Sequence, residues 1–150
     1  MNRVLIVDDD EDIAELISLI LKKEQIDSVI INNPLEVKKV INKEKFDLIL
    51  LDIMMPELSG IELCAKIRDD VRCPIVFLTA KNELVDKIVG YEVGADDYIT
   101  KPFDNTELLL KIKSHLRLNK RIDNRMAGSV MMINDLVLDK EAFEVKQNGN

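Results

Sequence analysis

Five polar side chains stand where four short apolar or β-branched segments of the chain end. They are Asp8 and Asp9 after the first segment, Asp52, Thr79 and Lys101. A carboxylate at the tip of a buried strand is costly unless its charge is needed there. If the four segments are neighbouring parallel strands, their carboxyl ends meet at one edge of the sheet, where ligands of open α/β sheets bind. Such a set of side chains suits one divalent metal ion and one phosphoryl group.

The chemical types of these side chains point to phosphoryl transfer. Mg²⁺ prefers oxygen ligands, and it often binds through one or two carboxylates, several waters and a phosphate oxygen. Crowded carboxylates repel one another, which raises their affinity for protons and promotes cation binding. An ionised Asp52 aligned with a phosphoryl donor can act as a nucleophile and form an acyl phosphate. Lys101 can offset the charge of the transferred group, and Thr79 can donate its hydroxyl to a phosphoryl oxygen.

Each of these residues also has an ordinary explanation when it is taken alone. The acidic run at 8–10 is suited to capping the helix that follows it. Lys101 alone is a solvated lysine, and Thr79 alone is a strand-end threonine. The functional interpretation depends on their arrival together from separate strands.

Two alternating periodicities predict the elements that position these residues. The predicted strands are residues 4–7, 29–31, 47–52, 74–79 and 97–100. Helical spacing follows each strand, with the last helix running from about residue 104 to 119. Among the apolar positions that mark helices are Ile13, Leu16, Ile17, Ile20 and Leu21 in the first, and Val85, Ile88 and Val89 in the fourth. This alternation predicts an α/β fold, a doubly wound parallel sheet covered on both faces, whose right-handed crossovers bring all strand carboxyl ends to one edge.

The composition limits the class and location of the protein. The chain has 150 residues, 47% hydrophobic and 33% charged, which is typical of one globular domain with a core. The net charge of −7 argues against a non-specific grip on nucleic acid by this chain. No apolar stretch approaches the roughly 20 residues of a membrane span and no signal segment opens the chain, so we expect a cytoplasmic protein with no membrane partner. Cys64 and Cys73 match no metal-ligand spacing and are expected to be reduced core thiols.

The sequence pattern changes after residue 119. Residues 120–129 are polar and contain a Gly-Ser pair, which predicts a linker. Residues 130–150 predict short antiparallel strands with an Asn-Gly turn signal. About 20 residues of β-hairpin cannot bury a core alone. The predicted organisation is therefore one domain at 1–119, a linker at 120–129, and the incomplete β-rich start of a truncated second domain at 130–150.

Four motifs give about the first 120 residues a resemblance to a known family. They are Val-Asp-Asp at 7–9, Leu-Asp-Ile-Met-Met-Pro at 51–56 with Gly60, Leu-Thr-Ala at 78–80, and Gly-Ala-Asp-Asp-Tyr-Ile-Thr-Lys-Pro-Phe at 94–103. At these spacings the chain resembles the receiver domain of two-component response regulators. The resemblance implies a flavodoxin-like sheet of five parallel strands in the order 2-1-3-4-5.

The resemblance also implies roles for the site residues. Asp52 would be the phosphoacceptor, and a histidine on a partner kinase would donate the phosphoryl group. Asp9, Asp52 and the carbonyl of Met54 would ligate Mg²⁺, with Asp8 acting through water. Lys101 would pair with the phosphoryl group, beside a cis peptide bond before Pro102.

A conformational switch is a further implication of the resemblance. Thr79 would move toward the phosphoryl group, and Tyr98 would rotate inward into the space that Thr79 vacates. Taken alone, Tyr98 is an aromatic side chain at the edge of the core. Phosphorylation would then bias a two-state element without creating a new fold.

The motif at 94–103, followed by a β-rich segment, looks like the winged-helix, OmpR/PhoB-type subclass of transcription regulators. Members of that subclass form homodimers through helix four, strand five and helix five, and the full-length protein, not this fragment, would bind promoter DNA. Lys111 stands where the family usually has Arg, whose planar fork pairs bidentately with carboxylates. The charges alone fit a solvated face, whereas three successive leucines at 108–110 favour an interface. The implied contacts are Lys87 with Glu107, Asp97 with Lys111, and Asp96 with Lys113, around Ile88, Tyr91 and Leu109.

Two other functions compete with a phosphorylation-switched transcription regulator. A stand-alone receiver that passes or stores phosphate would not need the segment at 130–150. An aspartate-nucleophile phosphatase of the haloacid dehalogenase type also combines a strand-end Asp, a Thr and a Lys around Mg²⁺. Such enzymes carry Asp-x-Asp, with the second Asp as general acid, and here Met54 stands at that position. We therefore expect a switch that is not an enzyme.

Overall fold

Five parallel strands form the centre of the molecule. The computed structural model describes residues 2–80 and 92–129, with side chains as far as Leu118. The strands pair in the order β2-β1-β3-β4-β5, as predicted. Their bounds are β1 Arg3–Val7, β2 Asp27–Ile31, β3 Leu48–Asp52, β4 Ile75–Ala80 and β5 Asp97–Lys101.

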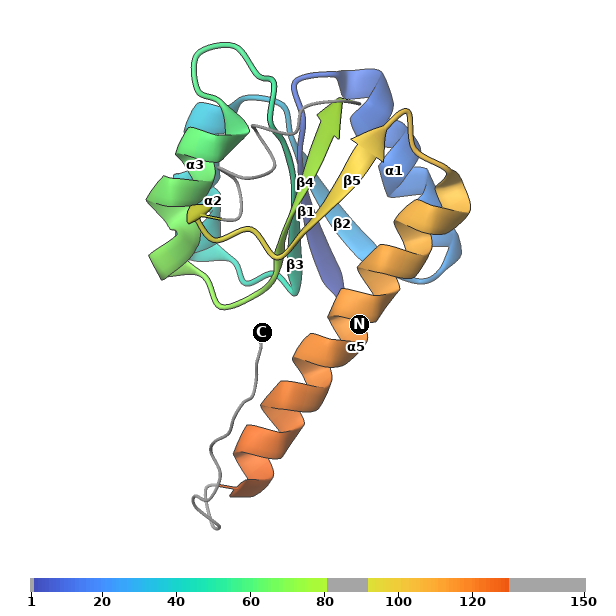
Figure 1. Ribbon diagram of the computed structural model, residues 1–150, viewed down its shortest axis with the longest axis vertical. Helices are drawn as coiled ribbons and strands as arrows, with labels where there is room; N and C mark the ends of the chain where they lie inside the picture. The colour runs from blue at the N-terminus through green and yellow to red at the C-terminus, as the bar shows by residue number, and fades with distance from the viewer. Residues whose placement is uncertain (1, 81–91, 130–150) are drawn as a thin grey trace. The chain divides into compact units, whose positions relative to one another are not determined.

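The helices lie on both faces of this sheet (Figure 1). On one face are α2 and α3, and on the other are α1 and the first part of α5. The bounds are α1 Glu11–Lys23, α2 Val37–Lys43, α3 Gly60–Ile67 and α5 Asn105–Ser129, with 3₁₀ turns at Pro34–Glu36 and Arg68–Asp70. The segment predicted as the fourth helix, with Val85, Ile88 and Val89, lies outside the described residues.

Alternation along the strands divides the core into two clusters. In β1, Leu5 and Val7 face the cluster under α2 and α3, whereas Val4 and Ile6 face the cluster under α1 and α5. All residues of β3 are buried, since helices cover both faces of the central strands. This is why its sequence is apolar without alternation.

The first helix shows how local sequence signals set an element. Asp10 is the N-cap residue, and its side chain accepts hydrogen bonds from the backbone N–H groups of Asp12 and Ile13. Acidic residues fill the first turn and lysines the last turn, as the helix dipole favours. Leu16, one of the apolar positions whose spacing predicted this helix, is 44% exposed. The buried stripe is Ala14, Ile17 and Leu21, and the helix carries more apolar positions than this stripe can cover.

The last helix is longer than the sequence predicted. It was expected to end near Asn119, whereas α5 reaches Ser129 and includes the residues predicted as a linker. Residues 117–127 contain no Gly or Pro and include three arginines, which favour helix, so no strong helix breaker interrupts this segment. The chain divides into two compact units at Leu116 and Arg117. The strands predicted at 130–150 lie outside the described residues.

Two further observations concern the whole described chain. Within the described residues, no helix is long and apolar enough to cross a membrane. Both cysteines are free and buried. Burial raises the pKa of the Cys64 and Cys73 thiols to about 11, so neither is a reactive thiolate near neutral pH.

Candidate functional site

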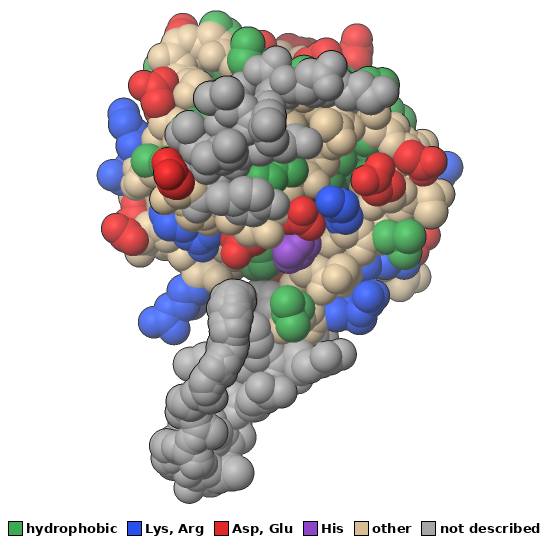
Figure 2. Space-filling model, viewed as in Figure 1, with side chains coloured by type: hydrophobic (Ala, Val, Ile, Leu, Met, Phe, Trp, Pro, Cys, Tyr) green, Lys and Arg blue, Asp and Glu red, His purple; other side chains and the backbone are tan. Residues whose placement is uncertain are grey.

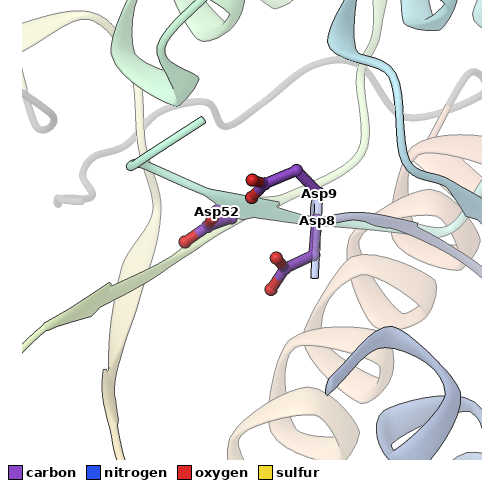
Figure 3. Close-up of side chains that lie close together, drawn as sticks. All are labelled: Asp8, Asp9 and Asp52. Atoms are coloured by element: carbon purple, nitrogen blue, oxygen red, sulfur yellow. The ribbon is translucent and has the colours of Figure 1, made fainter. Parts of the chain in front are cut away.

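Strand register explains why two aspartates meet at the carboxyl edge of the sheet. Val7 of β1 pairs with Leu51 of β3, so the residues that follow them, Asp8 and Asp52, lie side by side. Both are buried, with exposed fractions of 0% for Asp8 and 4% for Asp52. Asp9 follows and is exposed. One carboxylate oxygen from each of the three aspartates lies within 4.8 Å of the others (Figure 3).

Lys101 reaches this acidic cluster from the far edge of the sheet. It ends β5, which pairs with β4, and β4 separates it from β3. Its Nζ donates hydrogen bonds to Asp8 Oδ2 at 3.1 Å and to Asp52 Oδ1 at 3.0 Å. The peptide bond from Lys101 to Pro102 is cis, as predicted. The ammonium group therefore bridges two buried carboxylates that come from different strands.

Burial and like charge give Asp52 unusual proton affinity. Burial, followed by the neighbouring charge of Asp8, raises its pKa to about 6, although the hydrogen bond and charge of Lys101 act in the opposite direction. Burial alone would lower the pKa of Lys101, but its bonds to Asp52 and Asp8 outweigh burial and raise that pKa. A carboxylate with this pKa is largely ionised at neutral pH but held in an unfavourable environment.

The donor set fits a hard divalent cation. All side-chain donors are carboxylate oxygens, which Mg²⁺ prefers over nitrogen or sulfur. When they are ionised, three carboxylates against one ammonium leave two uncompensated negative charges, which equal the charge of such a cation. Asp8 is held in place because its Oδ1 accepts a hydrogen bond from the Asp10 amide at 2.9 Å. Asp8, Asp9 and Asp52 could therefore hold a metal ion.

Gly60 lets α3 begin directly against the end of β3. A Cβ atom at this position would lie 2.1 Å from the carbonyl oxygen of Asp52, which no side chain tolerates. The Gly60 amide donates to Ile53 O at 2.9 Å, and Ser59 caps the helix with Glu62 in a capping box. The intervening loop carries Met54, whose side chain is 66% exposed. The close packing fixes this loop beside the aspartates.

Thr79 and Tyr98 lie on the same side of the site as Lys101. Thr79 is buried near the end of β4 and pairs with Thr100 in the register of the sheet. Its Oγ1 makes a long contact of 3.5 Å with the carbonyl oxygen of Ala80. Tyr98 is also buried, and its ring packs on Phe77 with centroids 5.6 Å apart. The movement expected of these two residues stays a prediction.

The acidic residues predicted at a dimer interface have partners within the chain. Asp97 accepts from Lys111 Nζ at 3.3 Å and lies 2.9 Å from His115 Nε2. Burial alone would raise the pKa of Asp97, but the hydrogen bonds from His115 and from the Tyr98 amide, together with the charge of Lys111, lower it. Figure 2 shows the single histidine of the chain at the surface.

Within one molecule, Asp96 and Lys113 pair with residues other than those expected across the dimer interface. Asp96 pairs with Arg68 at 3.1 Å, and Lys113 pairs with Glu24. Glu107 and Leu109 lie on α5, and Leu109 is partly buried against the core. Lys87, Ile88 and Tyr91 lie outside the described residues. Contacts between two copies stay a prediction.

Arg68 and His115 are the residues whose importance the sequence did not reveal. Besides Asp96, Arg68 donates to the carbonyl oxygens of three residues from two loops, namely Gly94 at 2.8 Å, Val71 at 3.3 Å and Cys73 at 2.8 Å. It thereby ties the end of α3 to the segments that enter β4 and β5. A lone arginine or histidine at helical spacing gives no signal of such a partner, because the partner lies far away in sequence.

Comparison with known proteins identifies the class. Residues 4–113 match the family model described as the response regulator receiver domain. The chain therefore belongs to the response regulator receiver family, as its motifs predicted.

Particular relatives and solved structures agree with this assignment. The chain is 40% identical over 147 residues to the DNA-binding response regulator MtrA of Mycobacterium tuberculosis, covering 98% of this chain and 63% of that protein. The corresponding protein of Mycobacterium leprae is also 40% identical, with 98% and 64% covered. The chain thus spans less than two thirds of the length of these curated relatives.

Among solved structures, the BeF₃-activated N-terminal receiver domain of Klebsiella pneumoniae RstA matches with a TM-score of 0.74 and 38% identity, covering 77% of this chain and 99% of that one. A CheY-like receiver from Methanospirillum hungatei matches with a TM-score of 0.76 and 33% identity, covering 81% and 98%. These matches agree with the observed strand order.

Proposed function

We propose that this chain is the phosphoacceptor part of a response regulator and that Asp52 receives the phosphoryl group from a partner histidine kinase. The observation that carries this proposal is the buried Asp52, which Lys101 bridges to Asp8 and which has a carboxylate oxygen within 4.8 Å of one from Asp9. A buried carboxylate with a raised pKa, a fixed ammonium group and two further acids is unfavourable for stability alone. Phosphoryl transfer gives each of these groups a role.

The proposed transfer proceeds by direct displacement. An oxygen of the Asp52 carboxylate attacks phosphorus in line with the bond to the imidazole nitrogen of the donor histidine. The new P–O bond forms as the P–N bond breaks, and the nitrogen keeps the bonding electron pair. Lys101, already within hydrogen-bond distance of Asp52, neutralises part of the charge on the transferred group. The product is an acyl phosphate on Asp52.

Asp8, Asp9, Asp52 and the carbonyl of Met54 are the proposed ligands of Mg²⁺, with Asp8 acting through water. Bound there, the ion would screen the negative charge of the attacking carboxylate and of the phosphoryl oxygens. The support in this chain is the set of three carboxylates within 4.8 Å of one another. Burial, followed by the charge of Asp8, raises the pKa of Asp52, and the repulsion among the carboxylates favours the binding of a cation.

The proposed output is a switch in assembly. Thr79 moves toward the acyl phosphate, Tyr98 follows, and the surface formed by helix four, β5 and α5 pairs with a second copy. Asp97 and Lys111, which already contact each other within one chain, lie on that surface. Both residues would need to exchange or share partners when two copies meet, which lets phosphorylation control the pairing.

We further propose an OmpR/PhoB-type organisation for the longer protein, which acts in the cytoplasm as a transcription regulator. Residues 1–119 form the receiver, 120–129 connect it, and 130–150 begin a winged-helix domain that binds promoter DNA. Two findings support this. The MtrA protein of Mycobacterium tuberculosis, named as DNA-binding, aligns with 147 residues of the chain, and this match covers only 63% of its own length.

Intact-mass analysis after incubation with acetyl phosphate and Mg²⁺ tests the phosphoacceptor. We expect a mass gain of one phosphoryl group, absent in Asp52→Asn and retained in the matched control Asp69→Asn, whose side chain is exposed. Omission of Mg²⁺ should prevent the gain. A gain that survives Asp52→Asn, or none in the unaltered chain, contradicts the proposal. Size-exclusion chromatography of the two states then tests the phosphorylation-dependent dimer.

A further inference from the structure

The outward face of α1 carries two leucines that belong to neither of the two core clusters. Leu16 is 44% exposed and Leu19 is 59% exposed. At 100° per residue, Asp12, Leu16, Leu19 and Lys23 fall within a narrow stripe opposite the buried stripe of this helix. Their spacing of four, three and four residues is that of a coiled-coil seam. The structure therefore leaves a helix-packing seam in contact with solvent.

A shallow groove beside this seam extends its apolar surface. It has a volume of about 280 Å³ and lies between α1 and the start of α5. Its lining residues include Ile20, Leu109 and Leu110, with Lys23 and Lys113 among the polar ones. Leu110 is itself exposed. Figure 2 shows hydrophobic and basic side chains near one another on the side of the molecule where α5 begins.

The seam is self-complementary about its own centre. In two antiparallel copies of one helix related by a two-fold axis, residues whose numbers have the same sum lie at the same level. With the axis between Ile17 and Ser18, Leu16 meets Leu19 of the other copy, and Asp12 meets Lys23. Both charged side chains are exposed, and within the described part of the chain neither takes part in an ion pair.

We propose that α1 is a second self-association surface, on which another copy of this chain docks its own α1 in antiparallel orientation. The dimer has two Leu16–Leu19 contacts at its centre and two Asp12–Lys23 ion pairs at its ends. A helix from an unrelated protein would fit the leucines equally well. The observation that favours a second copy is that one two-fold axis places Leu16 opposite Leu19 and Asp12 opposite Lys23 at the same time.

The size of the surface makes this association weak. A helix of 13 residues is about 20 Å long, so the pair of helices buries less than the roughly 1,600 Å² of a standard interface. We expect half-dissociation at about 0.1 mM, in the range of transient complexes. The α1 seam lies apart from β5 and does not involve Asp52, so the association needs neither Mg²⁺ nor a phosphoryl donor. The groove beside it shares Leu109 and Lys113 with the surface proposed for the phosphorylation-dependent dimer.

Charge exchange provides the test. Lys23→Glu places Glu opposite Asp12 at both ends of the homodimer, and Asp12→Lys places Lys opposite Lys23. Each variant alone should stay monomeric in sedimentation velocity measurements without Mg²⁺ or phosphodonor. An equimolar mixture of the two restores opposite charges at both ends, so the mixture should associate as the unaltered chain does. Leu19→Glu should abolish association in every mixture, and circular dichroism checks that each variant is folded.

The results separate this proposal from the proposed function. Association of the unaltered chain that is lost in each charge variant and regained in the mixture supports it. A chain that stays monomeric up to about 1 mM, where weak interfaces of this size still form, overturns it. So does association that Leu19→Glu leaves unchanged. If the α1 amide resonances move only when a histidine kinase is added, the face belongs to the kinase and the proposal is wrong. Phosphorylation of Asp52 can succeed or fail in all these cases.

Discussion

Asp52→Asn is expected to stabilise the metal-free protein at neutral pH, although it removes a residue at the centre of the site. Asp52 is 4% exposed, beside the charge of Asp8, and its pKa is raised from 3.8 to about 6. At pH values between 3.8 and about 6, the folded state binds more protons at Asp52 than the unfolded state does. Stability contributed by the protonated carboxyl is therefore present at low pH and lost as pH rises through about 6.

The magnitude follows from the pKa difference. A shift of about 2 units at about 1.4 kcal/mol per unit gives about 3 kcal/mol as the upper limit at pH 7 and above. An asparagine does not ionise and keeps about the same volume, so the variant escapes this cost. Lys101 keeps Asp8 as a partner in the variant, at 3.1 Å in the present structure, which avoids an unpaired buried ammonium group. A gain of 3 kcal/mol corresponds to an increase in Tm of about 6 to 12 °C.

Urea unfolding of both proteins at several pH values, in the presence of a chelator, measures this difference. The free energy of unfolding of Asp52→Asn should exceed that of the unaltered chain at pH 7.5, and the difference should shrink toward zero near pH 4. Asp69→Asn, at an exposed position, is the matched control and should change stability by no more than about 0.5 kcal/mol. A variant that is less stable at pH 7.5, or a difference that does not depend on pH, refutes the reasoning.

Two further predictions concern the metal and the packing behind the site. Mg²⁺ should raise the Tm of the unaltered chain, and at a concentration of 100 Kd the added stability should be about 2.7 kcal/mol. The increase should be much smaller in Asp9→Asn. Differential scanning fluorimetry measures both proteins, and an equal increase in the variant would exclude Asp9 as a ligand. Gly60→Ala should destabilise the fold by at least about 2 kcal/mol, because its Cβ would lie 2.1 Å from the Asp52 carbonyl oxygen. Gly94→Asn should also destabilise it, because Gly94 has a φ of +107° and a Cβ there would lie 2.4 Å from Cδ of Arg68, whose side chain is fixed by four hydrogen bonds. Thermal unfolding measures both variants, and a Gly60→Ala protein as stable as the unaltered chain would contradict this account of the close packing.

The sequence allowed the site to be predicted because its residues obey a topological rule. Asp8, Asp52 and Lys101 each end or follow a strand, and parallel strands with right-handed crossovers bring those ends together whatever the intervening sequence. Thr79 followed from the same rule. The five strands could be located because buried strands in such a sheet are continuous apolar segments bounded by polar residues.

Contacts between side chains of different elements were beyond this kind of prediction. The bonds of Arg68 to Gly94 and Cys73 depend on how the end of α3 is turned relative to two loops, which no local pattern encodes. The exposure of Leu16 shows a related limit. Periodicity identifies a helix, but a helix with more apolar residues than one stripe does not specify which of them faces the core.

The bridge from Lys101 to Asp8 and Asp52 has a consequence for the biogenesis of the protein. Its two hydrogen bonds join residues 93 and 49 positions apart in the chain, and they connect the last strand of the sheet to the first and third. On the ribosome, Asp52 is made well before Lys101 exists, so a nascent chain carries the acceptor carboxylate without its counter-charge. The site is completed only when β5 docks. Competence to receive a phosphoryl group therefore reports that synthesis and folding of the sheet are finished.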